Sequence, residues 1–282
     1  MRRIYQVTMS AVLMTVLGLQ AASAADLKVA TKPKRSHSLE REAKAGRMRA
    51  LKYLEKSQLP DGSWSKHPAI TGLVVMAMVG SGEKEYGALS EPVQSGLAFV
   101  RKHVQEDGGI YQRFYANYTT SVCLMALHAA GQEEDRKIML DARAYLLKLQ
   151  ADGQEDFDRD DPQYGGFGYE LSRKGGMRKP DLSNLQWSIE ALKVTEEMEK
   201  ADQPGGAAQA GQSTKLAFDK ALVFLARCQN LKAVNDQKWA ENDGGFVYSP
   251  YESKAGEEQH GGLRSYGGMT YAGLKSMIYA DV

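Results

Sequence analysis

One phrase recurs four times along the sequence and constrains the fold more than any other feature. A helix with a charged face ends near a Gln, a Gly follows with an aromatic residue two positions later, and a more apolar helix comes next. The stretches that join the two helices are Gln58–Trp64, Gln105–Tyr111, Gln150–Tyr169 and Gln229–Tyr248. Such recurrence is typical of repeat proteins, in which helical pairs bury their apolar faces only by stacking on neighbouring pairs.

The second helix of each copy is predicted to be buried. These helices are expected over about Pro68–Val79, Tyr118–Ala129, Asn184–Val194 and Thr270–Tyr279. They are apolar nearly all round, whereas the first helices carry Lys, Arg and Glu on one face. The pattern therefore predicts an all-α fold of alternating outer and inner helices, with Gly in turns that need positive φ. Periodicity alone leaves both a closed ring and an open solenoid as possibilities.

The N-terminus has the pattern of a secretory signal peptide. Arg2 and Arg3 precede the apolar run Met9–Leu19, and small residues at 22–24 offer a cleavage site near Ala24–Ala25. The run is short for a membrane span, which needs roughly 20 residues. We expect residues 1–24 to be removed, no transmembrane span in the mature chain, and a secreted or periplasmic protein. An uncleaved anchor is the alternative.

Composition and charge limit the rest of the chain. The formal net charge of +1 argues against nucleic acid as an electrostatic partner. Residues 25–45 are polar and rich in Lys and Arg, which predicts a solvated linker or, alternatively, a basic arm. Residues 46–282 form the predicted repeat domain. Cys123 and Cys228 lie in apolar stretches and are interpreted as small buried residues, although an exported compartment also permits a disulfide.

The repeated phrase resembles the QW repeats of squalene and oxidosqualene cyclases. Gln58-x-x-x-Gly62-x-Trp64 and Gln105-x-x-x-Gly109-x-Tyr111 have the same spacing, and the other two copies carry insertions. The stretch 265–275 is similar to an inner helix of secreted bacterial proteins with prenyltransferase and squalene-oxidase repeats. The resemblance covers about residues 45–282 and implies an α/α toroid of six hairpins. Four are counted here, so the toroid would be incomplete, lacking two repeats or closed by a protein partner.

The acid of the resembled cyclases is not matched. Those enzymes place Asp-x-Asp-Asp at the start of an inner helix, where this chain has Asp181-Leu182-Ser183-Asn184. A serine hydroxyl cannot protonate an alkene, which is a very weak base. The literal Asp-Arg-Asp-Asp at 158–161 lies in the third insertion before Pro162 and is interpreted as a solvated loop.

The zinc ligands of the resembled prenyltransferases are not matched either. The resemblance places ligands at Asp181, Ser183 and Met269, of which only the aspartate suits zinc. The sequence therefore predicts no metal and no cofactor.

A set of hydrogen-bonding residues remains at the expected mouth of a cavity. The predicted ligand-binding residues are Tyr118, Thr119, Asp181, Ser183, Asn184, Tyr266 and Thr270. Their ligand would be an isoprenoid, another apolar molecule or a protein. The leading hypothesis is a non-catalytic binding module; the alternative is a terpenoid- or lipid-modifying enzyme with Asp181 as its catalytic candidate. Equally, residues 181, 183 and 184 suit the capping of the helix that follows.

Overall fold

The computed structural model describes residues 37–153, 157–169, 179–198 and 212–281. The chain divides into two compact units, Met1–Arg49 and Ala50–Val282. The predicted signal peptide and residues 25–36 of the predicted linker lie outside the described residues. Residues 37–45 were also predicted as linker, but they belong to helix α2, which runs from His37 to Lys56. Helix-favouring Ala, Glu, Lys and Arg dominate that stretch, so its polar character marks a solvated helix.

The described residues form an all-α structure, as predicted. They contain isolated β-bridges in the turns but no strand. The α-helices are α2 (His37–Lys56), α3 (Pro68–Gly80), α4 (Glu91–Arg101), α5 (Ala116–Ala130), α6 (Arg136–Leu147), α7 (Leu182–Val194), α10 (Gln212–Cys228) and α11 (Gly267–Tyr279). No helix in this described part is both long and apolar enough to cross a bilayer.

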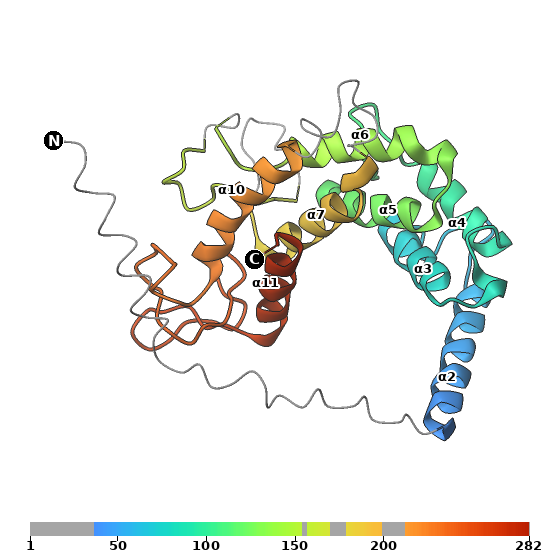
Figure 1. Ribbon diagram of the computed structural model, residues 1–282, viewed down its shortest axis with the longest axis horizontal. Coiled ribbons are helices and arrows are strands. Elements are labelled where there is room, and N and C mark those ends of the chain that lie inside the picture. The colour runs from blue at the N-terminus through green and yellow to red at the C-terminus, as the bar shows by residue number, and fades with distance from the viewer. Residues whose placement is uncertain (1–36, 154–156, 170–178, 199–211, 282) are drawn as a thin grey trace, which may run out of the picture. The chain divides into compact units, whose positions relative to one another are not determined.

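Helices α3, α5, α7 and α11 are the predicted inner helices. Each contacts the next, so that they form a row in chain order (Figure 1). Helix α5 lies between α3 and α7 and is buried on nearly every side, as expected for a helix without a charged face. Helices α3, α5 and α7 bury most of their residues, as predicted. Helix α11 was also predicted to be buried, but it buries only Ala272, Gly273 and Ser276, because no outer helix among the described residues packs on its free face.

Helices α4, α6 and α10 form the outer layer. Each packs on the inner helix that precedes it in the chain, in the pairs α3–α4, α5–α6 and α7–α10. Their buried residues fall on one face, while Lys and Glu occupy the other. Helices α3 and α11 stand at the two ends of the row and share no extensive contact with each other.

The glycine of each turn is fixed by close packing. Gly62, Gly108, Gly165 and Gly244 have φ values of 87, 89, 83 and 77°, which side-chain-bearing residues rarely adopt. A Cβ atom at the first three would collide with a backbone carbonyl of the next outer helix, that of Ser95, Asp141 or Lys220 respectively. Glycine therefore permits both the turn and the close approach of the next helix.

The second copy is displaced by one residue from its predicted register. The positive φ lies at Gly108, and the equivalent of Trp64 is Ile110, since the backbone amides of both bind an inner-helix threonine hydroxyl. The sequence pattern instead pointed to Gly109 and Tyr111. The pattern misled because Gly108 and Gly109 are adjacent and only one of them packs against Asp141.

In the first and third copies the recurrent glutamine ties the turn to the next outer helix. The side-chain amide of Gln58 donates to the carbonyls of Gly62 and, in α4, Pro92, at 2.9 and 2.8 Å. Gln150 donates in the same way to Gly165 and, in α10, Ala217, at 3.0 and 2.8 Å. Such bonds satisfy buried carbonyls that helix ends leave unpaired. The glutamine thus belongs to the framework.

The two cysteines behave as the sequence predicted. Cys123 in α5 and Cys228 in α10 are both fully buried and both free. Burial raises the pKa of each thiol, which keeps them protonated and unreactive.

Candidate ligand-binding site

Asp181 is the N-cap of α7. Its backbone is extended (φ −144°, ψ 158°), and its carboxylate accepts the backbone N–H of Asn184 at 2.9 Å. The side-chain amide of Asn184 donates to the other carboxylate oxygen at 2.7 Å. The aspartate is only 1% exposed. These contacts match the capping role that the residue types allowed.

Burial raises the pKa of the Asp181 carboxyl. Hydrogen bonds from Asn184 and from the Tyr248 hydroxyl act in the opposite direction, because they stabilise the ionised form. Burial likewise raises the pKa of Tyr248, to which the neighbouring Tyr169 and the charge of Asp181 contribute. The capping carboxylate and one tyrosine hydroxyl are therefore electrostatically coupled.

Five tyrosines connect three repeats around this cap, and we call them the tyrosine band: Tyr115, Tyr118, Tyr169, Tyr248 and Tyr266. The hydroxyls of Tyr169 and Tyr248 are 3.4 Å apart, and the rings of Tyr115 and Tyr169 meet edge to face at 5.3 Å. The charge of Asp181 contributes to the raised pKa of Tyr266, after burial. All five remain partly or largely exposed. The band thus offers ring faces and hydroxyls beside the starts of α5, α7 and α11.

Tyr115 adopts a backbone conformation that is unusual for its residue type. As the N-cap of α5 it is left-handed, with φ 58° and ψ 39°. A bulky residue in this region is an outlier, and such outliers cluster at functional sites. The strain fixes an exposed tyrosine against Tyr169.

Trp187 extends the aromatic surface along α7. Its ring meets that of Tyr118 edge to face at 5.5 Å, and the Lys275 ammonium lies 5.1 Å from its centroid. Lys275 also binds Glu190, which limits its freedom. An aromatic ring with a cation held over it is thereby presented beside the tyrosine band.

The remaining predicted residues have different environments. Thr119 and Asn184 are buried, and the Thr119 hydroxyl and the Asn184 side-chain oxygen lack hydrogen-bond partners among the described residues. Ser183 is half-buried on the first turn of α7. The Thr270 hydroxyl accepts the Phe246 amide at 3.1 Å, the role that Thr71 and Thr120 have in other repeats. Thr270, which was predicted to bind ligand, holds a turn through this bond.

Sequence reasoning missed part of this surface. Tyr115, Tyr169, Tyr248 and Trp187 were not among the residues predicted to bind a ligand. The available signal was the motif Gly-Gly-Phe-x-Tyr, which occurs at 165–169 and at 244–248. Both copies end in a tyrosine two positions after the phenylalanine. Phe167 is fully buried, whereas Tyr169, two positions later, is partly exposed.

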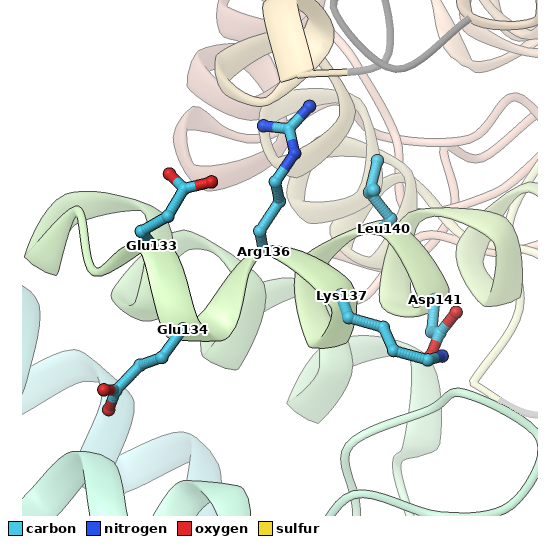
Figure 2. Close-up of a pocket in the computed structure, with 6 residues that line it drawn as sticks. All are labelled: Glu133, Glu134, Arg136, Lys137, Leu140 and Asp141. Atoms are coloured by element: carbon cyan, nitrogen blue, oxygen red, sulfur yellow. The ribbon is translucent and has the colours of Figure 1, made fainter.

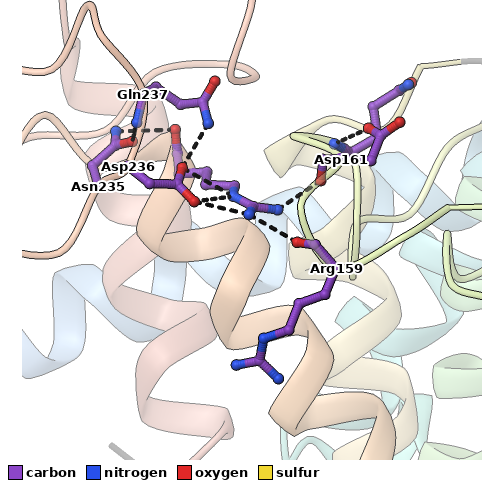
Figure 3. A network of polar contacts seen from close by, with 7 residues as sticks. Arg159, Asp161, Asn235, Asp236 and Gln237 are labelled. Carbon is purple, nitrogen blue, oxygen red and sulfur yellow. Dashed lines mark hydrogen bonds and ion pairs between the residues drawn. The ribbon is translucent and has the colours of Figure 1, made fainter.

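The Asp-Arg-Asp-Asp stretch lies in an exposed loop held by α10. The guanidinium of Arg227 donates to the backbone carbonyls of Arg159 and Asp161, at 2.8 and 2.6 Å, and pairs with the Asp236 carboxylate (Figure 3). The Asp161 side chain accepts the Gln163 amide and so shapes the turn. Carboxylates in this solvated environment do not form a dry acid.

Three depressions among the described residues include no residue of the tyrosine band. The largest of three, of about 500 Å³, lies along α6 among Glu133, Glu134, Arg136, Lys137, Leu140 and Asp141. Its charged side chains splay outward from the helix (Figure 2). The other two are lined mainly by the 219–236 and 232–262 stretches. Across the residues that the structure describes, no group of three His, Cys, Asp or Glu is arranged to hold a metal ion.

Comparison with family models of known proteins matches none of them to this chain, and a search of curated proteins finds no significant relative.

Proposed function

We propose that the chain is a non-catalytic binding module that holds an extended polypeptide segment of a protein partner across the tyrosine band. Its architecture would be an incomplete α/α toroid of the squalene-cyclase and prenyltransferase type, acting outside the cytoplasm. The observation that carries the proposal is the band itself, which joins three repeats through ring contacts and one hydroxyl pair.

The chemistry of tyrosine supports a polypeptide ligand. A tyrosine offers an apolar ring and a hydroxyl with few side-chain torsions to restrict, which explains its enrichment in protein interfaces. The band follows successive helix starts, so it suits an extended ligand with alternating apolar and hydrogen-bonding groups. A flexible isoprenoid would gain most from an enclosing apolar cup.

The environment of Asp181 supports a binding role over a catalytic one. Its two carboxylate oxygens already accept hydrogen bonds from Asn184, and its side chain caps α7. An acid that protonates a weak base needs a free proton directed at the substrate. The cap instead braces Tyr248, and through it Tyr169.

A displayed library of random peptides tests the proposal directly. We expect the full chain to enrich peptides that bind it, and the double variant Tyr115→Ala, Tyr169→Ala to lose them. Leu89→Ala, a change at an exposed site away from the band, is the matched control and should keep them. Enrichment of nothing, or of peptides indifferent to the two tyrosines, would contradict the proposal.

One observation favours a second candidate, an enzyme that modifies terpenoids or lipids. The raised pKa of Asp181 is the property that a general acid requires. Incubation with all-trans farnesol or squalene, followed by mass analysis, separates the two. A product formed by the full chain and absent with Asp181→Asn would establish catalysis, whereas unchanged substrate supports the binding module.

A further inference from the structure

The junctions between successive repeats share one construction. The turn of one repeat receives the next outer helix, whose backbone lies against the turn glycine at Gly62, Gly108 and Gly165. In each case the contacting carbonyl lies nine residues before the residue that pairs with the turn: Ser95 before Val104, and Lys220 before Gln229. The junction is therefore a register-specific docking of a helix on a turn.

Two positions of the docking helix recur with it. One residue after the contacting carbonyl stands a small buried residue: Gly96, Ala142 or Ala221. Three residues further stands a buried aromatic: Phe99, Tyr145 or Phe224. Tyr145 packs on Gly109, and Phe224 packs on Gly166. A small residue admits the backbone, and an aromatic then fills the space beside the second turn residue.

The fourth turn has the same receiving parts without a helix on them. Gly244 has the positive φ of its counterparts, but nothing lies within 4 Å of where its Cβ would be. The amide of Gln229 donates to Gly244 at 3.1 Å and has no second acceptor among the described residues, unlike Gln58 and Gln150. This turn is prepared for a docking helix.

The inner helix beside that turn is uncovered on the corresponding face. Leu274 of α11 occupies the position of Val75, Leu124 and Ile189, which are fully buried by later helices, yet it is 53% exposed. Tyr271 and Ile278 lie on the same side, at 76% and 63%. Residues spaced by three and four positions share one helix face, so these three form a continuous apolar strip.

The first outer helix carries the complementary parts. Counting from Gln58 as from its counterparts, the small residue of α2 is Ala50 and the aromatic is Tyr53. Ala50 is exposed and Tyr53 is 71% exposed, whereas the equivalent residues of α4, α6 and α10 are buried. Helix α2 therefore has the docking signature of an outer helix, and no turn among the described residues is docked on it.

We propose that this chain associates head to tail, with α2 of one copy docked on the turn of Gly244 and on α11 of a second copy. The contact would repeat the internal junctions: the backbone carbonyl of Arg49 would lie against Gly244 with Ala50 beside it, Tyr53 would cover Gly245, and Leu274 would be buried. Two different faces meet, so the interface is heterologous and allows short chains or a closed ring of copies. It does not involve the tyrosine band and stands or falls separately from ligand binding.

A complementation experiment with two blocked variants tests the proposal. Tyr53→Glu introduces a charge on the donor face, and Leu274→Glu introduces one on the receiving face. In sedimentation velocity at rising concentration, we expect the full chain to form dimers and longer species, and each variant alone to remain monomeric. Their equimolar mixture should form a dimer and nothing larger, because one open donor and one open receiver remain. Leu89→Glu, at an 86% exposed site on neither face, should behave as the unsubstituted chain.

Three outcomes would overturn the proposal. The first is an unsubstituted chain that stays monomeric throughout the range. The second is association that the mixture of blocked variants fails to restore, which indicates a different, symmetric interface. The third is association that either blocked variant alone retains, which means that the donor and receiving faces are not both required. Circular dichroism of both variants verifies that the helices are retained.

Discussion

The junction at Gly165 and the turn at Gly244 are made from nearly the same residues but do different work. Each has the recurrent glutamine (Gln150 or Gln229), two glycines, a buried phenylalanine and a tyrosine, in the same order. At the first, α10 lies on the turn and Lys220 touches Gly165; at the second, the space is open. The comparison shows that the sequence phrase encodes a receiving surface, which is packed where a helix lies on it and open where none does.

Truncation to alanine of equivalent aliphatic residues in α7 and α11 should show the largest difference in stability. Ile189→Ala in α7 removes a fully buried side chain and should cost about 2–5 kcal/mol of unfolding free energy. Leu274→Ala in α11 should cost less than about 0.5 kcal/mol in the monomer, because the side chain is already half exposed. Urea unfolding at low protein concentration measures both. Equal costs would mean that α11 is covered.

Alanine at the turn glycines should give the next largest contrast. Gly244→Ala should cost about 1–2 kcal/mol, the penalty of a left-handed alanine. Gly165→Ala adds a collision with the Lys220 carbonyl, and overpacking of this kind costs typically 1–3 kcal/mol more. The comparison of the two unfolding free energies isolates the contribution of the docked helix. Equal losses of unfolding free energy in the two variants would contradict the presence of a docked helix at Gly165 alone.

Replacement of the recurrent glutamines by alanine should give a smaller difference in unfolding free energy. Gln150→Ala leaves two carbonyls, of Gly165 and Ala217, without their donor, and should cost about 2 kcal/mol. Gln229→Ala frees only the Gly244 carbonyl and should cost about 1 kcal/mol or less. Thermal unfolding of the two variants against the unsubstituted chain gives both values. A larger loss for Gln229→Ala would show a second bond at the last turn.

The smallest expected effect is the pH dependence that Asp181 adds. Its pKa in the folded state is raised above the ordinary 3.8, so the folded chain binds the proton more tightly than the unfolded chain. The contribution of this group to stability is therefore largest below pH 3.8 and declines as the pH rises through the raised pKa. Asp181→Asn keeps a capping side chain and should flatten that decline. Denaturant midpoints at several pH values would contradict the assignment if the variant kept the full slope.

Helix positions could be predicted because their signals are local. The inner helices begin and end within three residues of their predicted bounds, since an all-round apolar pattern marks a buried helix wherever it packs. The register of the second turn could not be predicted. Two adjacent glycines satisfy the spacing, and only contact with Asp141 selects Gly108. Likewise, the bond from the Phe246 amide to the Thr270 hydroxyl joins residues 24 positions apart and could not be predicted.

The site was predictable in its centre and not in its extent. Asp181 stands out in sequence because it begins an inner helix, and the structure places it beside Tyr248 and Tyr266 as a cap. Tyr115 joins this surface through a left-handed backbone and a ring contact with Tyr169, which belongs to the next repeat. No pattern within one repeat carries that long-range information.

The docking of each outer helix on the preceding turn has a consequence for how such a chain changes length. Every junction joins a turn to the outer helix that follows it. The stretch between one recurrent glutamine and the next therefore contains both parts of a junction. Duplication of the stretch from Ala151 to Gln229 would add one complete junction, because the copied turn of Gly165 would receive the copied helix that carries Ala221 and Phe224. We therefore expect the gene to tolerate gain or loss of a whole repeat far better than an insertion of a few residues inside one.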